Sequence, residues 1–210
     1  MTFLIINLFL NLEMNNIIIS GTPGCGKTSV AKELSNLISG RIISLNELAI
    51  SDDFSFEYDE ERKTFIVDFK IFRPYILKKI KKIKQINPPF LIIESHFSDI
   101  IPNKYIDYAF ILRCNPDELV NRLKKKNYNL KKITENIQAE ILGNCVNYFI
   151  KKNVKKPLFE IDTTNLSIES VAKTIKNVIT DKEDGKNYSI GKIDWLEKLY
   201  QEDRLKEFFD

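Results

Sequence analysis

The feature that most constrains the fold is the stretch Gly21 to Thr28, which has the spacing G-x-x-x-x-G-K-T. It follows the apolar run 17–19 and precedes a segment, 27–39, with a helical pattern of apolar residues. Gly24 and Gly26 let the backbone curl so that successive N–H groups point inward, and the helix adds the positive end of its dipole. A strand, a glycine-rich loop and a helix in this order predict a site for nucleotide phosphates.

The loop also predicts how ATP and Mg²⁺ would be held. Lys27 would bridge the β- and γ-phosphates, and the Thr28 hydroxyl would ligate Mg²⁺. Thr28 and Ser29 begin the helix, whose N-terminus favours negative charge. The alternative is a glycine turn that only joins a strand to a helix, which the context on both sides disfavours. We therefore assign Gly24, Gly26, Lys27, Thr28 and Ser29 to nucleotide binding.

A second Mg²⁺ ligand is expected at the end of another strand, and Glu94 closes the apolar run 90–93. P-loop proteins usually place Asp at that point, and Glu reaches farther. His96, the only histidine of the chain, lies two residues on, where ligands bind in open α/β sheets. It contacts either the attacking water or the substrate, or it is structural. We predict catalytic roles for Lys27, Glu94 and His96.

Length and composition restrict the class of protein. The 210 residues suit one α/β domain, with 43% hydrophobic and 29% charged residues as in soluble enzymes. The net charge of +3 is too small to indicate nucleic-acid binding. Cys25, Cys114 and Cys145 form no C-x-x-C pair, so we expect neither disulfides nor zinc, and a cytoplasmic location. Residues 2–12 are apolar but too short for a bilayer, so no membrane anchor is expected.

Apolar patterns predict the secondary structure. Short continuous runs, typical of strands buried on both faces, occur at 17–19, 41–43, 90–93, 108–112 and 158–161. Helical patterns occur near 27–39, 68–86, 115–126, 131–153, 167–180 and 193–209. This alternation predicts an α/β fold with a five-stranded parallel sheet covered by helices.

The chain divides into three parts along its length. Residues 1–13 form an N-terminal extension, which is a mis-assigned start or a short extra strand or helix. The main domain is predicted at 14–180. Residues 181–210 are expected to form a polar linker and a C-terminal helix.

Several motifs, in this order, resemble one family. They are Gly21 to Thr28, the acidic stretch 58–61, Glu94-Ser95-His96 with Asp99 and Pro102, and the run 127–140. Together they resemble the small adenylate-kinase-like ATPases of ribosome assembly, which include the coilin-interacting nuclear adenylate kinase and archaeal relatives. The stretch 193–196 looks like the archaeal branch in particular. The resemblance covers about residues 16–180.

The resemblance implies a P-loop NTPase fold with sheet order 2-3-1-4-5, helices on both faces, a nucleoside-monophosphate-binding insert at 44–67 and a short lid at 125–135. In the family an Arg at the start of the lid contacts ATP. Lys126 matches that position and offers a point charge in place of a planar fork.

The implied activity is that of an adenylate kinase, which phosphorylates AMP or a related nucleoside monophosphate with ATP and Mg²⁺ and also hydrolyses ATP. The implied partners are a small-subunit ribosomal protein and pre-ribosomal RNA, in rRNA maturation. Lysines along 78–84 either form a solvated helix face or lie near RNA.

The insert leaves alternatives open. Residues 44–61 contain no Lys or Arg, while acids crowd the segment at Asp52, Asp53, Glu57, Asp59, Glu60 and Glu61. They would repel an AMP phosphate unless Arg41, Arg62 or Arg73 folds over it, or they form a solvated face. One alternative is therefore an ATPase switch or assembly chaperone with little monophosphate kinase activity. A small-metabolite kinase of the shikimate type is the third hypothesis.

Overall fold

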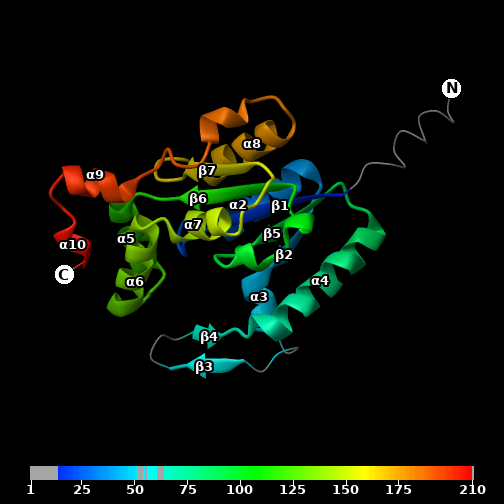
Figure 1. Ribbon diagram of the computed structural model, residues 1–210, viewed down its shortest axis with the longest axis horizontal. Coiled ribbons are helices and arrows are strands. Elements are labelled where there is room, and N and C mark those ends of the chain that lie inside the picture. The colour runs from blue at the N-terminus through cyan, green and yellow to red at the C-terminus, as the bar shows by residue number, and fades with distance from the viewer. Residues whose placement is uncertain (1–13, 52–53, 55, 61–63, 210) are drawn as a thin grey trace.

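The computed structural model describes residues 14–51, 54, 56–60 and 64–209, and the predicted N-terminal extension, 1–13, lies outside these ranges (Figure 1). Its main sheet is parallel and has the spatial order β2-β5-β1-β6-β7. The strands are β1 (Asn15–Gly21), β2 (Arg41–Ser44), β5 (Phe90–Glu94), β6 (Tyr108–Arg113) and β7 (Leu158–Asp162). Counted along the chain this order is 2-3-1-4-5, so the predicted fold class is confirmed.

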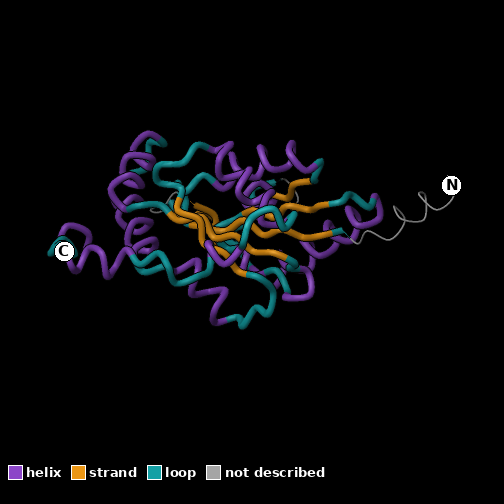
Figure 2. Tube along the Cα trace, turned by 90° about the horizontal axis from the view of Figure 1, so that it is seen from above, coloured by secondary structure: helices purple, strands orange, loops and turns teal. Residues whose placement is uncertain are grey.

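Helices cover both faces of the sheet (Figure 2). On β1, Ile17 and Ile19 belong to the cluster that packs on α2 (Lys27–Ile38) and α8 (Ile168–Ile179). Ile18 points the other way, toward α4 (Phe69–Ile86) and α7 (Asn144–Lys151). Because successive side chains of a strand point to opposite faces, the apolar run of β1 contributes to the hydrophobic cores on both faces of the sheet.

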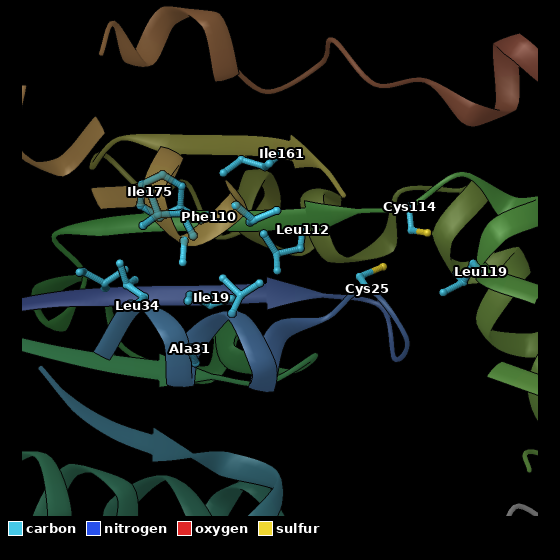
Figure 3. Packing of buried hydrophobic residues seen from close by; sticks show 14 of the residues in the cluster. Ile19, Cys25, Ala31, Leu34, Phe110, Leu112, Cys114, Leu119, Ile161 and Ile175 are labelled. Atoms are coloured by element: carbon cyan, nitrogen blue, oxygen red, sulfur yellow. The ribbon is translucent and has the colours of Figure 1, made fainter. Parts of the chain in front are cut away.

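The packing between β1, β6 and α2 holds the phosphate-binding loop in place (Figure 3). Ile19, Leu34 and Phe110 are fully buried there. Burial of each such side chain stabilises the fold by about 1.5–3 kcal/mol. The loop that joins β1 to α2 is therefore fixed at both ends by the core.

The predicted insert, 44–67, contains elements that the sequence pattern did not indicate. Its described part forms α3 (Leu45–Ala49) and an antiparallel hairpin of β3 (Glu57–Asp59) and β4 (Thr64–Ile66). Phe54 stacks on Phe56 with ring centroids 4.9 Å apart, and Phe54 meets Phe72 of α4 edge to face at 5.2 Å. Aromatic packing thus attaches the insert to α4.

Two predicted helices are wrong as single elements. The segment 131–153 forms α6 (Leu130–Ile141) and α7, separated at Gly143, whose φ of 62° lies in the left-handed region and interrupts the helical ladder. The segment 193–209 forms α9 (Trp195–Gln201) and α10 (Lys206–Phe209), with Asp203 at φ 55° between them. Short 3-10 turns occur at η1 (Ser98–Ile100), η2 (Asn103–Tyr105) and η3 (Gly185–Tyr188).

The segment predicted as a lid, 125–135, covers the last residue of α5 (Pro116–Lys125), the turn 126–129 and the start of α6. The C-terminal helices lie beside these two helices (Figure 1). Arg204 pairs with Asp117 of α5 at 2.8 Å, and the Gln138 side chain of α6 donates to the Phe208 carbonyl at 2.8 Å. Within the described ranges, no helix combines the length and apolar character needed to cross a bilayer.

Candidate functional site

The phosphate-binding loop has the backbone that its glycines allow. Gly24 and Gly26 have φ values of 100° and 93°, in the region that favours glycine. A Cβ on Gly24 would stand 2.6 Å from a methyl group of Leu119. Gly26 caps α2 without a side-chain hydrogen bond, so the first N–H groups of the helix remain available to an anion. The buried Lys27 donates from Nζ to the Thr22 carbonyl at 3.1 Å.

Two oxygen-bearing side chains meet beside Lys27. The Thr28 hydroxyl donates to Glu94 Oε1 at 3.2 Å. Glu94 is 1% exposed, and its Oε2 atom has no hydrogen-bond partner within the described part of the chain. A buried carboxylate oxygen without a partner is costly unless a cation compensates it, and Mg²⁺ prefers oxygen ligands. Thr28 and Glu94 therefore fit a Mg²⁺ ion.

Replacing Glu94 by Gln is expected to weaken Mg²⁺-dependent ATP binding by at least about tenfold, the low side of what a lost group around a metal costs. ATP binding measured in EDTA should change much less, because the loop and Lys27 are untouched. Titration calorimetry with and without Mg²⁺ measures both constants, and Glu47→Gln on the exposed side of α3 is the matched control. Equal losses with and without Mg²⁺ would remove Glu94 from the metal site.

A cleft of about 540 Å³ opens above the loop. The predicted residues Gly24, Gly26, Lys27, Thr28, Ser29, His96 and Lys126 all line it, and Glu94 lies beneath it. Its other walls come from the loop itself, α3, β4 and the start of α4, the turn after β5, the turn after α5, and α6. They comprise Pro23, Asn46, Ala49, Ile50, Phe65, Val67, Phe69, Phe97, Tyr128, Lys132, Glu135 and Asn136. The structure thus brings the predicted site residues together around one cavity.

His96 lies on the wall of this cleft, where water still reaches it. Burial among the surrounding walls, followed by the charges of Lys27 and Lys132, lowers the pKa of His96 from 6.5 to about 4. Its ring also meets Phe97 edge to face, with centroids 4.8 Å apart. His96 is therefore neutral at pH 7 and can accept a hydrogen bond from a molecule in the cleft.

The turn after α5 and the start of α6 contribute cations that reasoning from the sequence assigned only in part. Lys126 was predicted, but Lys132 also lines the cleft, with Nζ 4.8 Å from the centre of the Tyr128 ring. The sequence could have indicated Lys132, because it lies in the run 127–140 that carried the family resemblance. Reasoning from the sequence nevertheless assigned it no role in the site. With Lys27, these residues place three cations at the loop end of the cleft.

A smaller cavity of about 200 Å³ also borders the loop, at Gly24, Cys25 and Gly26. Gly24, Leu166 and Ile168 are among the residues that line it, together with the Arg122 guanidinium. Arg122 is fixed there, because it donates to the carbonyls of Thr163 and Thr164 at 2.8 and 2.9 Å. Arg122 and the turn after β7 were not predicted as site residues.

A protein family and several archaeal proteins are similar to this chain in sequence. The family described as "AAA domain" matches residues 17–143. A protein of Methanocaldococcus jannaschii described as "Putative adenylate kinase" is 35% identical over 184 residues, which cover 88% of this chain and 94% of that protein. A protein of Saccharolobus islandicus with the same description is 33% identical over 180 residues, which cover 86% and 87%.

Solved structures share the fold at low identity. A shikimate kinase from Acinetobacter baumannii has a TM-score of 0.57 at 14% identity and covers 84% of this chain and 98% of that one. A sugar kinase from Janibacter has a TM-score of 0.55 at 8% identity, covering 80% and 95%. By its match to the family model and its P-loop fold, the chain belongs to the AAA-domain family, and it is homologous to these archaeal proteins.

Proposed function

We propose that this protein is a cytoplasmic adenylate kinase, which transfers the γ-phosphoryl group of ATP to AMP or a related nucleoside monophosphate and also hydrolyses ATP. The observation that carries the proposal is the meeting of Lys27, Thr28 and Glu94 at the base of one cleft. The archaeal relatives described as "Putative adenylate kinase" support it.

The residues at the loop end of the cleft would hold the phosphates. Lys27 would exchange the Thr22 carbonyl for phosphate oxygens, while Lys126 and Lys132 offset the charge that spreads over the transferred group. Mg²⁺ on Thr28 and Glu94 would neutralise charge between the β- and γ-phosphates. We place the base of ATP in the smaller cavity, against Arg122, because a fixed guanidinium plane stacks well on aromatic rings.

His96 would act on water rather than on AMP. A phosphate oxygen of AMP is already deprotonated at neutral pH and needs no base, whereas an attacking water has to be oriented and has to lose a proton. Neutral His96 can accept that hydrogen bond, and its low pKa makes it better suited to orienting water than to holding the proton. We therefore assign His96 to the hydrolytic reaction.

Replacing His96 by Gly is expected to lower ATP hydrolysis at least about tenfold, while ATP affinity changes little. The loss is smaller than the roughly hundredfold or more of a full acid–base group, because His96 orients the water and does not hold its proton. Because the pKa is lowered, hydrolysis by the unaltered protein should stay level from pH 8 to about 6, where a histidine of ordinary pKa would be mostly protonated. A parallel loss of affinity and rate would place His96 in ground-state binding. A fall in rate centred near pH 6.5 would contradict the pKa shift.

Product analysis tests the kinase assignment. With purified protein, ATP, Mg²⁺ and AMP, two ADP should form for each AMP consumed, in addition to one ADP for each inorganic phosphate released by hydrolysis. If ADP and inorganic phosphate form without loss of AMP, the kinase assignment is refuted and the protein is only an ATPase.

A specific observation favours that ATPase as the second candidate function. The insert side of the cleft is lined by Ala49, Ile50, Phe65, Val67 and Phe69, and within the described residues no cation lines that end. Arg62, which could fold over an AMP phosphate, lies outside the described residues. If the described residues supply most of the contacts for a second phosphate, those contacts are few. Water would then compete well as the acceptor, and the protein would act as an ATP-driven switch or assembly chaperone.

The partners of such a switch would be a small-subunit ribosomal protein and pre-ribosomal RNA, in rRNA maturation. In support, α4 carries exposed lysines at 78, 81, 82 and 84, a charge pattern that suits phosphate backbones. Affinity for the isolated ribosomal protein should differ between the ATP-bound and ADP-bound states. RNA binding should weaken steeply as salt rises. Equal affinity in both nucleotide states would contradict the switch.

A further inference from the structure

Glu140 of α6 is buried beside the phosphate-binding loop, and no role in nucleotide binding explains it. It is 1% exposed. Its Oε1 atom accepts hydrogen bonds at 2.7, 3.1 and 3.2 Å from Arg113 Nε, the Cys114 backbone N–H and Trp195 Nε1. Its Oε2 atom accepts from the Thr22 hydroxyl at 2.5 Å and from the Cys25 thiol at 3.9 Å. One carboxylate oxygen is thus tied to the end of β6 and the C-terminal segment, and the other to the loop.

The loop residue that Glu140 holds is also the one that Lys27 contacts. The Thr22 hydroxyl donates to Glu140, while the Thr22 carbonyl accepts from Lys27 Nζ at 3.1 Å. A continuous series of hydrogen bonds therefore runs from Lys27 through Thr22 and Glu140 to the indole of Trp195. Phosphates that draw Lys27 away would change the first bond of this series.

The far end of the series is fixed as well. Arg113 pairs with Glu160 at 2.5 Å and donates to the Ile193 carbonyl at 3.3 Å, and Glu160 accepts from the Gly191 N–H at 2.5 Å. Trp195 is 8% exposed. The segment that leads into α9 is therefore held against the same buried charges that hold the loop.

We propose that Glu140 is a positioning residue that sets the loop through Thr22 and transmits the nucleotide state of Lys27 to Trp195 and the C-terminal segment. The proposal rests on the proposed function, because it requires a nucleotide in the loop. It gives the C-terminal segment 189–201 a role in reading the occupancy of the site, beyond packing on α6.

The single tryptophan of the chain makes this measurable. Trp195 is not among the described residues that line the cleft or the smaller cavity, so a change in its fluorescence on adding ATP and Mg²⁺ would not come from direct contact with nucleotide bound there. The unaltered chain should show a saturable change in emission, with the same dissociation constant that titration calorimetry gives.

Thr22→Val removes the bond to Glu140 and keeps the size of the side chain. It should bind ATP about tenfold more weakly, the loss expected for one hydrogen bond to a charged group. At saturating ATP its Trp195 emission should no longer change. The matched control, Thr22→Ser, keeps the hydroxyl and should retain both the affinity and the emission change.

The outcomes separate this proposal from the function on which it rests. An unaltered chain that binds no ATP by calorimetry would contradict both. If the unaltered chain binds ATP but its emission stays constant, or if Thr22→Val shows the full emission change at saturation, the role of Glu140 is refuted and the proposed function stands. If Glu140 had only a structural role, Thr22→Val would have a lower thermal stability but would keep the full change in Trp195 emission.

Discussion

The Lys27→Ala variant is expected to lose at least about a thousandfold in ATP turnover, the scale on which a single well-placed cation acts in phosphoryl transfer. Lys27 is buried, and its ammonium group lies at the Thr22 carbonyl, next to the loop N–H groups. Those N–H groups can still bind phosphates without it. They cannot by themselves offset the charge that develops between the β- and γ-phosphates in the transition state. The loss should therefore fall on the rate more than on ATP affinity.

The measurement is the initial rate of ADP formation with and without AMP, alongside ATP affinity. Lys32→Ala is the matched control, because Lys32 is exposed on the same helix, α2, and does not line the cleft. It should keep near-normal activity. Near-normal activity in Lys27→Ala would refute the whole site assignment.

The largest effect on stability is expected from Arg113→Leu, which should lower the free energy of unfolding by about 3–5 kcal/mol. Arg113 is 3% exposed and pairs with Glu140 at 2.7 Å and with Glu160 at 2.5 Å. Burial alone would lower the pKa of Arg113, but the two carboxylates outweigh it and raise that pKa. The guanidinium therefore stays charged, and its removal leaves two buried carboxylates uncompensated.

Urea denaturation followed by circular dichroism measures this loss. Arg41→Leu is the matched control, because Arg41 is exposed at the start of β2, and its cost should stay within about 0.5 kcal/mol. Similar small costs for both variants would show that the Glu140–Arg113–Glu160 group contributes little to folding.

The sheet could be predicted from the sequence because its signal is local and strong. Runs such as 90–93 are apolar throughout, which only a strand covered on both faces requires, and the glycine loop fixed β1 as the strand that precedes it. The hairpin of β3 and β4 gave no such signal. Its strands are only three residues long, and half of the residues that flank them are charged. The strands form because they pair with each other across the turn, and a local sequence pattern does not reveal such pairing.

The same distinction holds for the site. Gly24, Gly26, Lys27 and Thr28 lie within one motif, and Glu94 ends a strand that His96 follows. Parallel strands end at the same edge of the sheet, so a prediction of the motif and of the strands was enough to bring these residues together. Glu140 differs, because its partners come from positions 22, 113 and 195. A hint was present, since Glu140 shares the buried face of α6 with Ile137 and Ile141, where a charged residue needs a buried partner.

The most direct test of the kinase assignment follows one phosphoryl group. ATP labelled with radioactive phosphorus at its γ-position is mixed with unlabelled AMP, Mg²⁺ and the purified protein, and the labelled products are separated during the first few per cent of the reaction. A phosphoryl group carried from the cleft's loop end to AMP leaves the label in ADP. We predict that ADP carries most of the label and inorganic phosphate the remainder. Label found in inorganic phosphate alone, at any AMP concentration, would contradict the adenylate kinase assignment.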